Sequence, residues 1–216
     1  MEGMRKGILL TLLAGMIVAQ AGTKVACVGD SITFGATIKN RSKMSYPAQL
    51  QQELGDEYEV RNFGVNGATM QKATNRPYWK QRSYQKALAY APDIVIIKLG
   101  SNDSKPENWV SADLYITDYL EMIESFRQLP SRPVVYICLP IPAFPSNFTI
   151  TNKAITEEVI PAVKVVAERS ETKLIDLNTP MLEMGHLVPD RVHPNGEGAG
   201  VIARVVAEFL RAESAE

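Results

Sequence analysis

A histidine near the C-terminus follows an aspartate by three residues, in the segment Asp190-Arg191-Val192-His193-Pro194. At this spacing the carboxylate can accept a hydrogen bond from one ring nitrogen and leave the other nitrogen as a base. Pro194 disfavours a helical conformation at His193 and predicts a turn there. A surface turn with an incidental histidine is the alternative. We predict that Asp190 orients His193 as a general base.

A serine lies in the segment Gly29-Asp30-Ser31-Ile32-Thr33, directly after an apolar run. At a sharp turn from strand to helix its hydroxyl is presented at the sheet edge, where the positive end of the helix favours developing negative charge. Helix capping by Asp30 or Ser31 is the alternative. Thr33 excludes the G-x-S-x-G nucleophile elbow, which requires glycine at that position. Ser31 is therefore a candidate nucleophile.

Two other loops carry groups that can donate hydrogen bonds to an oxyanion. The glycines in Asn62-Phe63-Gly64-Val65-Asn66-Gly67 let a backbone N–H approach a ligand closely. In Gly100-Ser101-Asn102-Asp103, the asparagine can donate its side-chain N–H to the same point. A loop that needs positive φ and an Asx turn are the respective alternatives. These donors would complement a serine nucleophile.

Five apolar runs rich in β-branched residues precede these loops and predict strands. They are Lys24–Gly29, Glu59–Val65, Ile94–Leu99, Pro133–Leu139 and Lys173–Leu177. Apolar residues recur at helical spacing between and after them, over residues 114–126, 155–166 and 198–211. Pro161 interrupts the second of these helical patterns and predicts a kink.

Alternation of strands and helices predicts right-handed βαβ units and an α/β fold, a three-layer α/β/α sandwich on a parallel sheet. In such sheets ligands bind beyond the C-terminal ends of the strands. The serine, the donor loops and the histidine segment each follow a strand, so we expect them to meet there. No linker divides residues 22–216, which we predict to be one domain.

The composition limits the partners of the chain. Among 216 residues, 23 Lys and Arg balance 24 Asp and Glu, for a net charge of −1. A nucleic-acid partner needs a concentrated basic surface, so none is expected. The longest uncharged apolar run lies at the extreme N-terminus, so we expect no membrane span within the mature chain. The sequence makes no prediction of oligomeric state.

Residues 1–21 have the pattern of a secretory signal peptide. Arg5 and Lys6 precede an apolar stretch over residues 7–18, and Ala19-Gln20-Ala21 matches an A-x-A cleavage site. A membrane anchor is the alternative, but the apolar run is shorter than the roughly 20 residues that a span requires. We expect cleavage after Ala21 and a secreted or periplasmic mature protein.

The chain has two cysteines and two histidines, which offer no credible metal-ligand set. Cys27 and Cys138 lie in separate strand-like runs, with another strand expected between them. Their separation of about two strand spacings exceeds the reach of a disulfide, so we expect buried free thiols. No metal and no other cofactor is predicted.

Taken together, the four blocks resemble the SGNH (GDSL-type) hydrolase family. They are Gly29-Asp30-Ser31-Ile32, residues 62–67, Gly100-Ser101-Asn102-Asp103 and Asp190-Arg191-Val192-His193-Pro194, in the order of the family. The resemblance spans nearly the whole chain after residue 21. It implies a flavodoxin-like sheet of five parallel strands in the order 2-1-3-4-5.

The resemblance also implies a role for each site residue. Ser31 would be the nucleophile, His193 the base and later the acid, and Asp190 the group that orients the histidine. The backbone N–H of Ser31, Gly67 and Asn102 would form the oxyanion hole. Gly67 and not Gly64 takes this role because it stands five residues after Asn62, as in the family.

The segment from Asn102 to Trp109 resembles secreted carbohydrate acetylesterases, including sialate-type enzymes. We therefore expect a carboxylic ester hydrolase that removes acetyl groups from carbohydrates, with a small-molecule or glycan ester as substrate. Lys105 offers a charge to an acidic sugar. Trp109 offers a stacking face, although packing against the next helix is the alternative.

Three alternatives to carbohydrate deacetylation remain open. Within the family, they are a lysophospholipase or broad carboxylesterase, and an enzyme that transfers acetyl groups to sugars. A non-catalytic glycan-binding module would keep the fold without the chemistry.

Overall fold

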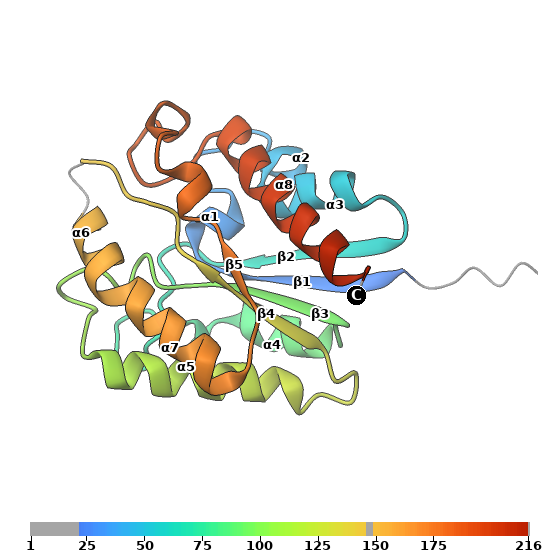
Figure 1. Ribbon diagram of the computed structural model, residues 1–216, viewed down its shortest axis with the longest axis horizontal. Coiled ribbons are helices and arrows are strands. Elements are labelled where there is room, and N and C mark those ends of the chain that lie inside the picture. Colours follow the sequence, from blue (N-terminus) through green and yellow to red (C-terminus); the bar gives the residue numbers. More distant parts are fainter. Residues whose placement is uncertain (1–21, 146–148, 216) are drawn as a thin grey trace, which may run out of the picture.

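The computed structural model describes residues 22–145 and 149–215. The predicted signal peptide, residues 1–21, lies outside the described residues. Five parallel strands form one sheet in the order β2-β1-β3-β4-β5 (Figure 1). They are β1 (Thr23–Gly29), β2 (Tyr58–Gly64), β3 (Ile94–Lys98), β4 (Val134–Leu139) and β5 (Leu174–Asp176). The sheet confirms the predicted α/β class and the predicted strand order.

Helices cover both faces of the sheet (Figure 1). One face packs against α4 (Arg82–Ala89), α5 (Ala112–Arg127) and α7 (Ile160–Ser170). The other face packs against α3 (Tyr46–Leu54) and α8 (Gly196–Glu213). Three short helices complete the layers: α1 (Ser31–Phe34), α2 (Arg41–Met44) and α6 (Asn152–Ala154). The predicted three-layer sandwich is therefore confirmed.

The central strands are buried on both faces, which explains their continuous apolar sequences. In β3, Val95, Ile96 and Ile97 are fully buried. Cys27 on β1 and Cys138 on β4 are buried free thiols with β3 between them, as predicted. Burial raises the pKa of the Cys27 thiol to about 12.

The irregularity expected at Pro161 takes the form of a π-helical turn over Ile155–Val159. The backbone N–H of Ile160 donates to the carbonyl of Ile155, and α7 then begins with Pro161 in its first turn. Proline is tolerated there because the first N–H groups of a helix have no intrahelical acceptor.

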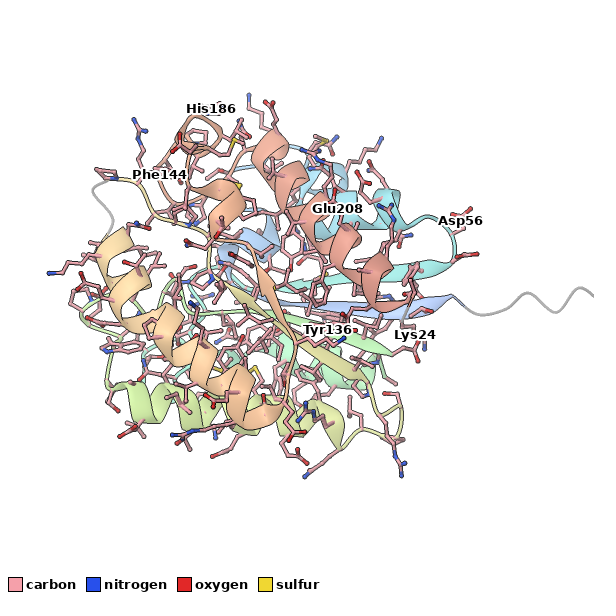
Figure 2. All side chains as sticks on the ribbon, in the orientation of Figure 1. Lys24, Asp56, Tyr136, Phe144, His186 and Glu208 are labelled. Carbon is pink, nitrogen blue, oxygen red and sulfur yellow. The ribbon has the colours of Figure 1, made fainter. Side chains whose placement is uncertain are left out.

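Short 3₁₀ turns lie at Tyr78–Lys80, Thr179–Met181 and Gly185–Leu187. The second histidine, His186, lies exposed in the last of these turns, at the edge of the molecule (Figure 2). None of the helices within residues 22–145 and 149–215 is both long and apolar enough to cross a bilayer.

Candidate active site

Ser31 is positioned by a tight turn between β1 and α1. Asp30 caps the helix, and its Oδ1 accepts the N–H of Ile32 at 2.9 Å. A Cβ on Gly29 would lie 2.1 Å from Oγ1 of Thr33 and 2.6 Å from the carbonyl oxygen of Lys98. Only glycine permits this approach of the turn to β3. The predicted alternative, helix capping, is thus the role of Asp30, while Ser31 faces another partner.

That partner is His193, which lies 162 residues further along the chain. The Ser31 hydroxyl lies 2.8 Å from Nε2 of His193, and Nδ1 of the same ring lies 2.6 Å from Oδ2 of Asp190. An ionised carboxylate can only accept, so Nδ1 carries the proton and Nε2 can accept from the serine. This tautomer is the one that a general base requires.

The turn that carries the histidine also fixes Asp190. Its Oδ1 accepts the backbone N–H of Val192 at 3.0 Å and that of His193 at 2.6 Å. Arg191 adopts a φ of +72° to close this turn. Partial burial acts to raise the pKa of Asp190, but the hydrogen bonds from His193 and Val192 outweigh it and hold the pKa below its ordinary value. The carboxylate therefore stays ionised beside the imidazole.

A cavity of about 260 Å³ opens beside these groups. Residues from five loops line it: Ser31, Ala36, Asn66, Gly67, Asn102, Lys105, Ile150, Val192 and His193. Gly67 has a φ of +73°, a conformation that glycine adopts freely. The predicted nucleophile, the predicted base and two predicted oxyanion donors thus line the same cavity.

The two glycines of the second block have different surroundings. A Cβ on Gly64 would lie 2.1 Å from the backbone nitrogen of Phe34, so this glycine lets β2 pack against α1. Gly67 lines the cavity and Gly64 does not. The placement agrees with the choice of Gly67 as a donor.

Asn102 is fastened from two directions. Its side-chain Nδ2 donates to the backbone carbonyl of Ala68, next to Gly67, at 3.1 Å. Its backbone carbonyl accepts from Nδ2 of Asn108 at 2.8 Å. The side chain is therefore tied to the second block and does not close an Asx turn. Its amide keeps a second N–H for an oxyanion.

Lys105 and Trp109 have different positions. Lys105 lines the cavity. The Trp109 ring packs against the apolar core, with its centroid 5.5 Å from that of Tyr115, and it is not among the residues that line the cavity. The structure thus brings Lys105 to the predicted site and places Trp109 in the packing role that the sequence left open.

The sequence reasoning missed two buried charged residues below the site, Lys98 and Asp103. Lys98 ends β3 and forms an ion pair with Asp30. Asp103 accepts the N–H groups of Met70 and Gln71, and burial nevertheless raises its pKa to about 6. A lysine at the end of the apolar run Ile94–Lys98 was the available signal, since a charge at a buried strand position needs a partner.

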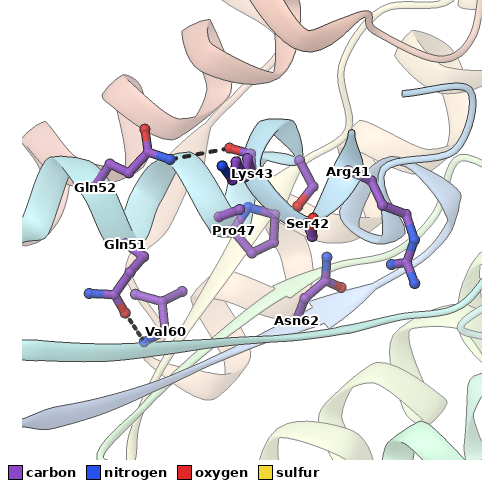
Figure 3. Close-up of a pocket in the computed structure, with 10 residues that line it drawn as sticks. Arg41, Ser42, Lys43, Pro47, Gln51, Gln52, Val60 and Asn62 are labelled. Atoms are coloured by element: carbon purple, nitrogen blue, oxygen red, sulfur yellow. Dashed lines mark hydrogen bonds between the residues drawn. The ribbon is translucent and has the colours of Figure 1, made fainter. Parts of the chain in front are cut away.

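A larger hollow, of about 380 Å³, lies between α2, α3 and β2 (Figure 3). Arg41 and Asn62 line it, and Gln51 accepts the Val60 N–H there at 2.7 Å. None of the predicted catalytic or oxyanion residues lines this hollow, so its size does not make it the reactive site. Across the described part of the chain, no group of three or more His, Cys, Asp and Glu residues is arranged to hold a metal ion.

The parallel sheet thus brings the predicted serine, histidine and oxyanion donors around one cavity at its C-terminal edge, the arrangement that the sequence resemblance led us to expect. The profile of the GDSL-like lipase/acylhydrolase family matches residues 27–201. The chain belongs to this family, which confirms the predicted family.

Comparisons with individual proteins agree with this assignment. An acetylxylan esterase from Xylanibacter ruminicola is 41% identical over 87% of this chain. The match covers 43% of that relative, so the chain spans less than half of its length. Two solved structures, both 18% identical, share the fold. They are a carbohydrate acetylesterase from Sinorhizobium meliloti (TM-score 0.69) and an aryl esterase from M. smegmatis (TM-score 0.70), each match covering 88% of this chain and 99% of the other.

Proposed function

We propose that this protein hydrolyses short-chain esters, chiefly acetyl esters of carbohydrates, through a Ser31–His193–Asp190 acyl-enzyme mechanism. The observation that carries the proposal is the 2.8 Å contact between the Ser31 hydroxyl and Nε2 of His193. The two residues are far apart in the sequence, and their contact lies at a cavity with room for a small acyl group.

In the first step, Nε2 of His193 takes the Ser31 proton as Oγ attacks the ester carbonyl carbon. The carbonyl π electrons move to oxygen, and the oxyanion accepts from the Ser31 and Gly67 backbone N–H groups and from the Asn102 side chain. The C–O bond to the alcohol then breaks, and the alcohol leaves with the proton from His193.

In the second step, water attacks the acyl-serine by the same route in reverse. His193 takes a proton from the water, the tetrahedral intermediate forms again in the oxyanion hole, and Ser31 leaves with its proton restored. The Asp190 carboxylate stabilises the imidazolium in both steps because it is held ionised.

Two observations support acetyl as the acyl group. The cavity has a volume of about 260 Å³, and Ile150 and Val192 give it an apolar part that suits a short acyl group. The relative that is 41% identical is an acetylxylan esterase. A lysophospholipase, in contrast, would need a long apolar channel.

We further propose that Lys105 contacts an acidic sugar of the substrate. Among the described residues that line the cavity, it is the only Lys, Arg, Asp or Glu. Its place three residues after Asn102 puts it near the acetyl-binding end of the site. A carboxylate on the sugar that carries the acetyl group would match this charge.

The proposal is tested by acetate release from acetylated xylan, pectin, chitin oligomers and O-acetyl sialosides. Labelling by a fluorophosphonate probe reports the nucleophile directly. We expect labelling and acetate release in the wild type, and neither in Ser31→Ala or His193→Ala. The matched control is His186→Ala, which removes the exposed histidine outside the site and leaves activity intact.

Three outcomes would contradict the proposal. Rates against nitrophenyl esters that rise from acetyl to octanoyl would favour the lysophospholipase or broad esterase alternative. A folded protein that is not labelled and releases no acetate would favour a glycan-binding module. Acetylation of an added acceptor glycan would instead identify an acetyltransferase.

Export is the remaining part of the proposal. The charged start, apolar stretch and Ala19-Gln20-Ala21 site support removal of residues 1–21 and a secreted or periplasmic location. N-terminal sequencing of the protein from an expressing bacterium tests this directly. A mature chain that begins at Gly22 supports it, and an intact Met1 in the cytoplasmic fraction contradicts it.

A further inference from the structure

A lysine ammonium lies fully buried beneath the predicted site. Lys98 ends the central strand β3, and its Cα lies opposite Gly29 in the register of β1 with β3. The side chains of Lys98 and Asp30 are both 0% exposed. The Nζ atom lies 3.0 and 3.2 Å from the two Asp30 carboxylate oxygens and 2.8 Å from Oγ of Ser101. Three acceptor atoms thus satisfy the three ammonium protons.

These contacts join two loops of the predicted site. Asp30 directly precedes the nucleophile Ser31, and Ser101 directly precedes the oxyanion donor Asn102. Asp30 also holds the first turn of α1 through the Ile32 N–H. One ammonium group therefore connects the residue before the nucleophile to the residue before an oxyanion donor.

Stability alone is a poor explanation for this arrangement. Removing two charges from water costs about as much as their attraction returns, and a buried ion pair is often replaced by apolar residues without loss. On the same face of β3, two residues before Lys98, the strand carries the fully buried apolar side chain of Ile96. The buried charge of Lys98 therefore indicates a role that an apolar side chain at this position could not fill.

We propose that Lys98 is a positioning residue, which holds the Ser31 turn and the Asn102 loop at the spacing that acyl transfer requires. This inference rests on the proposed ester hydrolysis. Lys98 is fully buried and does not line the cavity, so it acts through Asp30 and Ser101 and touches no substrate.

The first test is Lys98→Met, which keeps the length of the side chain and removes its charge. We expect kcat for 4-nitrophenyl acetate to fall by about 10²-fold, the order that a misplacement of about 1 Å costs. KM and the affinity for a glycan product stay within about twofold, because the binding surface is untouched. The rate of fluorophosphonate labelling at Ser31 falls in parallel with kcat.

The second test separates position from stability, because Lys98→Met leaves a buried carboxylate without its cation. Asp30→Asn combined with Lys98→Met removes both charges, and asparagine remains a good helix cap. We expect this double variant to recover most of the thermal stability while kcat stays low. A double variant with wild-type kcat would overturn the proposal, whether or not the single variant folds.

The third test addresses the link to the oxyanion loop. Ser101→Ala removes one acceptor of the ammonium and leaves the ion pair, and we expect kcat to fall about tenfold with an unchanged KM. The matched control is Ser104→Ala in the same loop. The two serines are 3% and 2% exposed, but the Ser104 hydroxyl donates to the Ser101 backbone carbonyl, whereas the Ser101 hydroxyl accepts from Nζ of Lys98.

Equal losses in Ser101→Ala and Ser104→Ala, or no loss in either, would overturn the role of the lysine. A wild-type protein that is neither labelled nor active is a different result. It would remove the proposed hydrolysis itself, and this inference with it.

Discussion

Replacing Asn102 with alanine tests the oxyanion hole most directly. The side chain is 5% exposed, lines the cavity with Ser31 and His193, and donates one N–H to the Ala68 carbonyl at 3.1 Å. Its other N–H is the proposed donor to the oxyanion. Loss of one such donor costs about 2.7–4 kcal/mol of transition-state stabilisation, or about 10²–10³-fold in kcat. KM should change little, because the donor acts on charge that develops only in the transition state.

The same substitution has a separate effect on stability. Loss of the hydrogen bond to Ala68 removes about 1 kcal/mol. In a domain of this size that lowers the Tm by about 2–4 °C. The fall in kcat is therefore far larger than partial unfolding of the sample can explain, and a melting curve measured beside the kinetics separates the two effects.

The chain offers a matched control in Asn66→Ala. Asn66 lines the same cavity but is not a predicted donor, so kcat for 4-nitrophenyl acetate should stay within about threefold of the wild type. A third variant, Asn102→Asp, keeps the size and places an acceptor where a donor is needed, and it should be at least as slow as the alanine variant. If Asn102→Ala retains a kcat like that of Asn66→Ala, Asn102 has no part in the oxyanion hole.

Three other predictions follow from single residues. Asp190→Asn should lower kcat by about 10⁴-fold, because an amide no longer selects the Nδ1–H tautomer of His193, and steady-state kinetics with an unchanged circular dichroism spectrum would check it. Burial raises the pKa of Asp103 to about 6, so between pH of about 4 and 6 the folded protein holds a proton that the unfolded chain has released. The free energy of unfolding of the protein should therefore fall by about 3 kcal/mol as the pH rises through that window, at about 1.36 kcal/mol per pH unit. Urea titrations at several pH values measure this slope, which Asp103→Asn should lack; an identical slope in that variant would contradict the assignment. Cys27 and Cys138 should not react with a thiol reagent until the protein unfolds, because burial raises both pKa values, and rapid reaction of the native protein would contradict this.

The strands were predictable from sequence because the central ones are apolar on both faces. The expected run Ile94–Leu99 corresponds to β3 (Ile94–Lys98), and each end of the other four runs agrees with the structure to within one residue. The helices α3 and α4 were not predicted. In α4, only Tyr84 and Ala87 are buried, so its apolar stripe is too short to stand out from a polar segment.

The candidate site was predictable because Ser31, Gly67 and Asn102 closely follow strands, and parallel strands end at a common edge. The histidine segment follows β5 through a longer connection that contains two 3₁₀ turns. The ion pair of Lys98 was not predictable, since its partner Asp30 directly follows another strand, β1, and only the sheet register brings the two residues together. The positions of the Lys105 and Trp109 side chains could not be predicted from the sequence either. They lie four residues apart in one irregular segment, where no helical or strand periodicity sets the direction of a side chain, and only the fold shows that Trp109 packs against Tyr115.

The histidine and its carboxylate are three residues apart, whereas the serine hydroxyl comes from the opposite end of the domain. A fragment that carries residues 190–193 already contains half of the machinery, and it gains a nucleophile only when the N-terminal strand docks. Ester cleavage would then report completed assembly of the whole domain. Two separately expressed pieces, divided between β4 and α7, would recover turnover only as they associate. The rate of ester cleavage would then measure how much of the two pieces has combined.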